Sequence, residues 1–353
     1  MAESNIQPRA YHFNEPPDRL SFLRQGAKAR AILSQGIPEI FGYSLQMAAP
    51  RALSFGLLLC MCTLEPRAIA DQADARYRTG MALKQEGKDD EAILELEAAV
   101  AARPNHAMAW NSLGILYKKK GDFPKAVAAF EQAVKLMPNN AVARANLGMA
   151  YFRAGRDADA IRLLDESIEL DPNNGDVHAN LGTIKRKKGD IEGAVRNLKE
   201  AARLKPGSSE TLSNLGVALS YSKRDQEAIE AFKKAIQISP EVAEYHFNLA
   251  AVYRRKELYD EAIVENKEAV RLNPSLADAW YDLGVMHRSK RNNQEAIEAF
   301  RKYLELTQGK DTAADQRVKD DIKALEGNYA SQPPRRAPAK APTKKKASPR
   351  AKK

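Results

Sequence analysis

The chain has 353 residues, a net charge of +10 and 44% hydrophobic residues, with only 19 Gly and 18 Pro. This composition is sufficient for a packed core and excludes the collagen-like and fibrous classes. Both cysteines, Cys60 and Cys62, lie in one apolar run. Disulfides and cysteine-based metal or redox sites are therefore unavailable to the residues that follow Ala70.

The N-terminal part contains an apolar run at residues 52–64, followed by a small-residue triplet that ends at Ala70. The run is too short to span a bilayer, which takes roughly 17–25 residues, and it resembles a secretory signal peptide. We therefore predict a signal peptide at residues 47–70, with Met47 as the true start, and an exported, periplasmic or envelope protein. Residues 1–46 are expected to be disordered or not translated. The alternative is a cytoplasmic protein in which the run is a buried helix or has no role.

A pattern of 34 residues repeats seven times between Ala73 and Lys310, and its positions are counted below from the start of each unit. Position 20 is always alanine, while positions 7, 8 and 32 are Leu, Gly and Pro in six of the seven units. A fixed period of this length is typical of helical repeat proteins. The predicted units are 73–106, 107–140, 141–174, 175–208, 209–242, 243–276 and 277–310.

Each unit is expected to form two antiparallel helices. Small residues at positions 8 and 20 allow the helices to approach closely, where a larger side chain would cost about 1–3 kcal/mol. Apolar residues at positions 7, 11 and 24, such as Leu147, Tyr151 and Leu164, lie on the inward stripes. The proline at position 32 ends the second helix, and Asn-rich turns follow it.

The second unit shows the pattern most completely, from Trp110 through Leu113, Gly114 and Tyr117 to Pro138. This pattern resembles the tetratricopeptide repeat family. The resemblance implies an all-α fold, a right-handed α-solenoid of seven helix-turn-helix hairpins across residues 71–310. Three residues depart from it and are expected to loosen individual hairpins: Lys185 and His287 at position 11, and Asn266 at position 24.

A further helix is predicted at residues 311–328, after the seventh unit. Its apolar stripe consists of Ala314, Val318, Ile322 and Leu325, and its other faces are charged. A terminal cap needs this arrangement, because it covers the last repeat on one side and meets water on the other.

The resemblance also implies that the first helix of each unit lines a concave surface. Position 6 carries a ladder of polar residues: Asn146, Asn180, Asn214, Asn248 and Asp282. An amide has both a donor and an acceptor, so the ladder is predicted to pair with the backbone of an extended peptide. It resembles the asparagine-lined superhelix of the enzyme that attaches N-acetylglucosamine to Ser and Thr. The alternative is that Asn is simply common at this position in the family.

Basic residues gather at positions 12 and 13, among them Arg153, Lys187 and Arg255. Beside the ladder they would favour an acidic peptide or a terminal carboxylate. The alternative is that they only complement the negative end of the helix dipole.

The C-terminal residues 329–353 are rich in Lys, Pro and Ala, and residues 331–353 contain nine basic side chains and no acidic one. We expect a disordered tail, which is predicted to bind an anionic polymer, a lipid headgroup or nucleic acid, or else to act only as a solubilising segment.

No catalytic motif or phosphate loop is present, and the five histidines are scattered, with His178 and His246 at position 4, where we expect them to pack. We therefore predict no catalysis, no metal and no cofactor, and a scaffold that binds a partner protein or peptide on its concave surface. The alternative is a cytoplasmic or nucleoid-associated scaffold whose tail binds nucleic acid.

Overall fold

The structure is a computed structural model that describes residues 66–307 and 312–330. All of these residues belong to one compact unit, Thr63–Lys353. They form helices and no strand. The helices are α2 Pro66–Gln85, α3 Asp89–Ala102, α4 Ala107–Lys119, α5 Phe123–Leu136, α6 Ala141–Arg153, α7 Asp157–Leu170, α8 Gly175–Lys187, α9 Ile191–Leu204, α10 Ser209–Tyr221, α11 Asp225–Ile238, α12 Ala243–Arg255, α13 Tyr259–Leu272, α14 Ala277–Ser289, α15 Asn293–Thr307 and α16 Thr312–Ala330.

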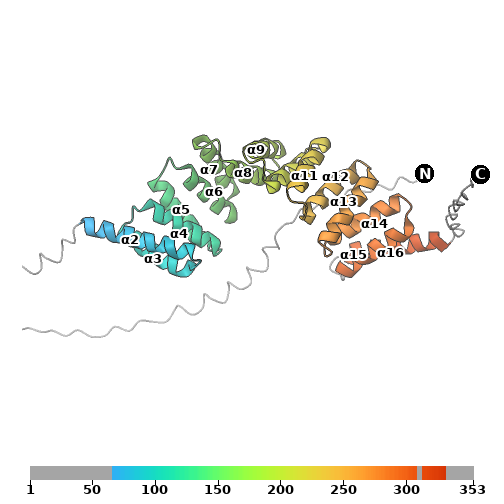
Figure 1. Ribbon diagram of the computed structural model, residues 1–353, viewed down its shortest axis with the longest axis horizontal. Coiled ribbons are helices and arrows are strands. Elements are labelled where there is room, and N and C mark those ends of the chain that lie inside the picture. The colour runs from blue at the N-terminus through green and yellow to red at the C-terminus, as the bar shows by residue number, and fades with distance from the viewer. Residues whose placement is uncertain (1–65, 308–311, 331–353) are drawn as a thin grey trace, which may run out of the picture. The chain divides into compact units, whose positions relative to one another are not determined.

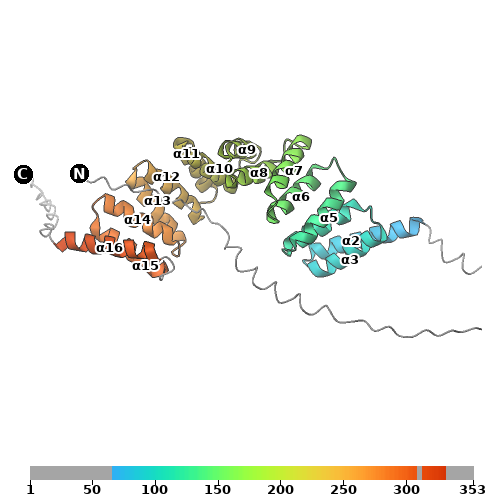
Figure 2. The ribbon, with the colours of Figure 1, turned by 180° about the vertical axis from the view of Figure 1, so that it is seen from behind.

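The helices pack in chain order as seven hairpins, from α2 with α3 to α14 with α15, and α16 follows the last hairpin (Figure 1). The same order is visible from behind (Figure 2). Each helix contacts the helix before it and the helix after it. The predicted all-α solenoid of seven hairpins with a C-terminal helix is therefore confirmed.

The turns between hairpins form at the predicted proline and asparagine residues of the repeat. After the Pro-Asn-Asn segments, Asn140 and Asn174 cap the next helix, and their side chains accept hydrogen bonds from the backbone N–H of Ala143 and Val177 at 2.9 and 3.3 Å. Within each of the first four hairpins, the turn between the helices contains a glycine with φ between 78° and 86°. The last three hairpins have Lys223, Glu257 and Arg291 there instead, with φ of 57–59°, a conformation that disfavours a side chain.

The core of each hairpin lies between positions 8, 20 and 24. The seven alanines at position 20 are fully buried. A Cβ atom on Gly182 would lie 2.6 Å from the side chain of Leu198, and one on Gly216 would lie 2.8 Å from the ring of Phe232. The glycine is therefore required for the close approach of the two helices, as the sequence predicts.

A repeated hydrogen bond closes the seam between consecutive hairpins. The position-4 side chain donates an N–H to the carbonyl oxygen of the proline six residues earlier, in five of the six seams. The donors are Trp110 Nε1 at 2.8 Å, Arg144 Nε at 2.8 Å, His178 Nε2 and His246 Nε2 at 2.9 Å, and Trp280 Nε1 at 3.0 Å. Both histidines are buried, so the prediction that they pack is confirmed.

The three departures from the repeat have different consequences. The Nζ atom of Lys185 donates a hydrogen bond to Asp165 at 3.3 Å. In the preceding seam, the equivalent hydrogen bond runs from the Tyr151 hydroxyl to Glu131. His287 is buried, and its Nδ1 atom lies 3.4 Å from Asn292 Nδ2. Lys185 and His287 thus both have partners, so the predicted loosening has a structural basis only at Asn266.

The side chain of Asn266 is completely buried, and neither of its polar atoms has a hydrogen-bond partner among the described residues. An unpaired buried amide is destabilising by about 1–3 kcal/mol.

The last helix, α16, has the predicted apolar stripe. Ala314, Val318 and Leu325 are buried, and Ile322 is partly buried in the same cluster as Phe300. Ion pairs from Arg288 to Asp321 at 2.5 Å and from Arg301 to Glu326 at 2.8 Å join this helix to the last hairpin. The helix therefore covers the end of the repeat array.

The described part of the chain begins inside the predicted signal peptide, because α2 starts at Pro66. Ala73, at which the first repeat unit begins, is fully buried. The rest of the signal peptide, the segment 1–46 and residues 331–353 of the predicted tail lie outside the described residues. Residues 329 and 330, which were predicted to belong to the disordered tail, instead form the end of α16.

Candidate peptide-binding face

The first helices of the hairpins form a continuous row. In addition to its own partner helix, α4 contacts α6, α6 contacts α8, α8 contacts α10 and α10 contacts α12. At 100° per residue, positions 2, 6, 9 and 13 lie within about 60° of one another on each of these helices, and position 12 lies about 60° further round. We refer to these positions, taken along the row, as the first-helix face.

The four predicted asparagines lie on this face and are partly buried, with Asn248 the most enclosed at 8% exposure. Asn146 donates an Nδ2 hydrogen bond to Asn111 Oδ1 at 3.1 Å. The side chains of Asn180, Asn214 and Asn248 make no hydrogen bond to other described residues. Three successive repeats therefore present amides whose donors and acceptors are available to a ligand.

The fifth member of the predicted ladder, Asp282, differs from the asparagines. It is only 3% exposed, and its Oδ1 atom lies 3.5 Å from Nη1 of Arg254, at position 12 of the preceding hairpin. Position 12 of one hairpin thus meets position 6 of the next. At this seam the cation and the anion neutralise each other within the protein.

Two earlier seams have the cation without the anion. Arg186 and Lys118 occupy position 12, and position 6 of the next hairpin is Asn214 or Asn146 in place of aspartate. Burial lowers the pKa of the Arg186 guanidinium, and burial together with the charge of Arg153 lowers the pKa of Lys118. The Nε atom of Arg186 is buried and has no hydrogen-bond partner among the described residues. These seams therefore hold partly desolvated positive charge that no described carboxylate balances.

The predicted basic residues at position 13 have different environments. Arg153 is exposed and is close enough to Lys118 to affect its pKa. Lys187 lies with its Nζ atom 5.4 Å from the centre of the Phe152 ring, in the preceding hairpin. Arg255 pairs with Asp225 and also donates to Ser220 Oγ at 3.0 Å. Arg255 is therefore engaged within the protein, and Arg153 and Lys187 lie beside the uncompensated seams.

Sequence reasoning missed a set of ion pairs that recurs with the repeat. A basic residue at the end of a first helix pairs with an aspartate at the start of the preceding second helix, about 30 residues earlier. The pairs are Lys119 with Asp89 at 2.5 Å, Lys188 with Asp157 at 3.0 Å, Lys120 with Asp90, Arg255 with Asp225 and Lys290 with Asp260. The constant separation was the signal that could have identified them.

The described part of the chain contains no cluster of three or more His, Cys, Asp or Glu residues that could hold a metal. Between residues 66 and 330, apart from the gap at 308–311, no helix is long and apolar enough to cross a bilayer.

Models of the tetratricopeptide repeat family match most of the repeat array. Those described as tetratricopeptide repeat match residues 77–120, 118–183, 175–208, 243–276 and 267–311, and one described as TPR repeat matches residues 221–257. A comparison with curated proteins found no match.

Two solved structures with TM-scores above 0.5 have the same fold. The C-terminal part of a TPR repeat-containing protein from Cytophaga hutchinsonii is 16% identical with a TM-score of 0.57, over 70% of this chain and 99% of that one. PilF of Pseudomonas aeruginosa is 18% identical with a TM-score of 0.52, and the match covers 63% of this chain and 97% of that one. The crystal structure of MamA is also similar: it is 27% identical with a TM-score of 0.45, and the match covers 46% of this chain and 96% of that one. Because models of the family match most of the repeat array and the structure has the seven hairpins, the chain belongs to the tetratricopeptide repeat family.

Proposed function

We propose that the protein is a non-catalytic scaffold that binds an extended acidic segment of a partner protein along the first-helix face. The observation that carries the proposal is that the half-buried Arg186 faces Asn214 at position 6 of the next hairpin, where Arg254 has the carboxylate of Asp282, and no described carboxylate pairs with it. A carboxylate brought by a ligand would neutralise this guanidinium in the way that Asp282 neutralises Arg254.

The amides of Asn180 and Asn214 lie on the same two hairpins as this site. They supply donors and acceptors that match a peptide backbone whatever its side chains are. The asparagines therefore provide general peptide binding, and Arg186 with Lys118 provides the preference for acidic residues. An exported location and a nucleic-acid-binding tail remain predictions from the sequence.

The test uses the full-length chain and fluorescence anisotropy with a fluorescein-labelled, capped hexaglutamate peptide at physiological salt. We expect Arg186→Gln to weaken binding about ten-fold, because a hydrogen bond to a charged group contributes about 1.5–3 kcal/mol. The matched control is Arg196→Gln, which removes an exposed arginine from the second helix α9 and should leave the affinity unchanged.

The double variant Asn180→Ala/Asn214→Ala should weaken hexaglutamate and hexaglutamine binding alike while helicity and melting temperature stay constant. A benzophenone-labelled hexaglutamate should crosslink to α8 and α10. Crosslinks confined to residues 331–353, or equal losses in the Arg186 and Arg196 variants, would show that the acidic peptide binds elsewhere.

A further inference from the structure

The seam between the fourth and fifth hairpins lacks the repeated hydrogen bond that closes the other seams. Its position-4 residue is Leu212, which has no N–H group, so the carbonyl of Pro206 receives no side-chain donor from that position. In the neighbouring seams, His178 donates to Pro172 and His246 donates to Pro240, both at 2.9 Å. Among the second to seventh hairpins, the fifth is thus the one whose position-4 side chain makes no hydrogen bond to the preceding proline carbonyl.

The same seam has a second departure, at position 11. The second and third hairpins have Tyr117 and Tyr151 there, which bond to an acidic residue of the preceding hairpin. The fifth hairpin has Leu219 at position 11, and Lys199 stands where the seams of the second and third hairpins have the acidic partner. Lys199 donates a hydrogen bond across the seam to Glu227 at 2.8 Å. In the fifth hairpin, leucines therefore occupy both position 4 and position 11, where the hairpins compared above have bulky polar side chains.

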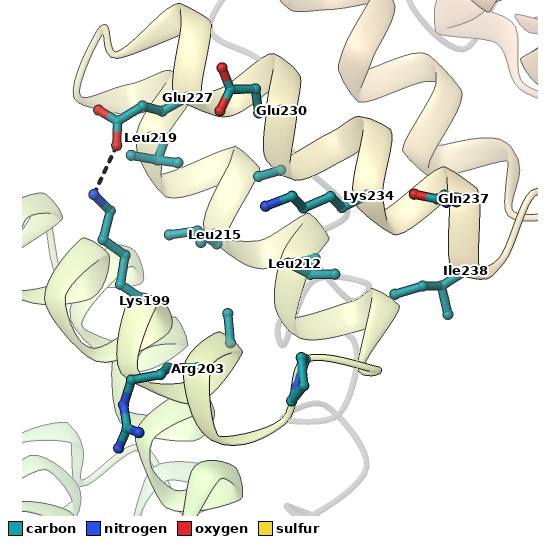
Figure 3. A pocket seen from close by; sticks show the side chains of 13 residues that line it. Lys199, Arg203, Leu212, Leu215, Leu219, Glu227, Glu230, Lys234, Gln237 and Ile238 are labelled. Atoms are coloured by element: carbon teal, nitrogen blue, oxygen red, sulfur yellow. Dashed lines mark hydrogen bonds and ion pairs between the residues drawn. The ribbon is translucent and has the colours of Figure 1, made fainter.

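The result is a hollow of about 700 Å3, which we call the seam hollow. The second helices α9 and α11 form its walls, and α10 forms its floor (Figure 3). Its apolar surface comes from Ala202, Leu212, Leu215, Leu219, Ala231 and Ile238. Its volume is within the range of about 300–1,000 Å3 that is typical of ligand pockets.

The seam hollow lies away from the first-helix face. Positions 4, 7 and 11 of α10, which are Leu212, Leu215 and Leu219, point about 180° away from positions 2, 6 and 9 at 100° per residue. A ligand in the seam hollow would therefore leave Asn214 and Arg186 free to act on the first-helix face.

The other seams indicate which chemical group fits. The space next to the proline carbonyl is filled in two of them by an indole, from Trp110 or Trp280, whose Nε1 donates at 2.8 or 3.0 Å. An indole joins a large apolar surface to one N–H donor, which matches a leucine-lined hollow whose lining includes Pro206, the proline whose carbonyl has no donor at position 4. At the rim, Glu230 and Lys234 are exposed and have no ion-pair partner among the described residues, so they can bind the polar backbone on either side of an inserted side chain.

We propose that the seam hollow is a second binding site, which accepts the tryptophan side chain of an exposed segment of a partner protein. The indole lies on the three leucines and donates its N–H to the carbonyl of Pro206, as Trp110 and Trp280 do for their own prolines. The site adds a sequence-specific anchor on the second-helix side of the array.

The experiment is a chemical-shift titration of the 15N-labelled full-length protein with the capped pentapeptide acetyl-Gly-Ser-Trp-Ser-Gly-amide. We expect the shifts to concentrate on the amides of Leu212, Leu215, Leu219 and Ala231. The same peptide with 1-methyltryptophan, which has no indole N–H, should bind about five-fold more weakly, the factor that one net hydrogen bond of about 1 kcal/mol gives.

Two variants test the geometry. Leu212→Trp fills the seam hollow from within and should abolish the shifts, while its matched control Leu94→Trp, at a 66% exposed leucine of α3, should leave them intact. Leu219→Tyr restores the position-11 aromatic and gives the same test if Leu212→Trp does not fold.

Three results would overturn the proposal. One is the absence of shifts at these amides at millimolar peptide. Another is equal affinity for the tryptophan and 1-methyltryptophan peptides, which would remove the role of the Pro206 carbonyl. The third is tighter binding of free tryptophan than of the peptide, which would identify a small-molecule site.

Discussion

A Cβ atom added to Gly114 would lie 2.6 Å from the ring of Phe130, which is fully buried in the second hairpin. The contact joins positions 8 and 24, and it limits how large either residue can be. At 2.6 Å a methyl group overlaps the ring, so the two helices or the ring would have to move.

Gly114→Ala should therefore lower the free energy of unfolding. Overpacking costs about 1–3 kcal/mol, and the higher helix propensity of alanine returns about 1 kcal/mol, which leaves a net loss of about 1 kcal/mol. Urea denaturation measures this change. The control is Gly327→Ala in α16, where a Cβ would meet nothing within 4 Å, and a gain in stability is expected. A stabilised Gly114→Ala variant would contradict the close contact.

The sixth hairpin combines two substitutions at the same pair of positions, Ala250 and Asn266. We expect the double variant Ala250→Gly/Asn266→Leu to be more stable than the native chain. Removing the unpaired buried amide is worth about 1–3 kcal/mol, which outweighs the loss of about 1 kcal/mol in helix propensity at residue 250. The single change Asn266→Leu should gain less, because its side chain meets the methyl group of Ala250. Thermal or urea unfolding of the four proteins in the cycle measures the coupling, and strict additivity would contradict the contact.

Glycine should be favoured at the turn residues of the last three hairpins. Glu257 has φ of 59° and its side chain is exposed, so Glu257→Gly removes the cost of a left-handed conformation, about 1 kcal/mol. The expected result is a higher melting temperature in a thermal scan. As a control, Glu241→Gly, at an exposed residue whose φ is not positive, should give no gain. Equal effects of both changes would argue against strain at Glu257.

Stability should decrease on the acidic side of neutrality, in part through His287. Burial lowers the pKa of this imidazole below its ordinary value of 6.5. Between the folded and unfolded pKa values the unfolded chain binds more protons, so the free energy of unfolding falls as the pH drops below 6.5. His287→Phe, which restores the position-11 aromatic, should make urea-derived stability less dependent on pH between 7 and 5. An unchanged pH dependence would show that His287 does not contribute.

The fold was predictable because each repeat position has a chemical type that can be read from one unit to the next. Alanine at position 20 and glycine at position 8 identify the helix contact directly. Position 4 was harder, since Trp110, Arg144 and His178 share only an N–H group at a similar distance from the backbone. Without that common role, Leu212 does not stand out as an exception, and the seam hollow was not predicted.

The repeat positions of the candidate site residues were predictable from the sequence, but the charge balance around them was not. The ladder positions follow from the period, and the structure places all four asparagines on the first-helix face. The pairing of Arg254 with Asp282, however, depends on how position 12 of one hairpin meets position 6 of the next. That contact is set by the packing between hairpins, so the sequence did not distinguish the neutralised cation from Arg186.

The repeated packing of each hairpin on its neighbours also bears on how the chain forms during synthesis. In the described residues, packed helices are consecutive or belong to adjacent hairpins, and the ion pairs at the seams join residues about 30 apart. Contacts of such short range close quickly and need no distant segment of the chain. Each hairpin can therefore dock on the one before it as soon as the ribosome releases it, and α16, the last of the described helices to emerge, then covers the end of the array.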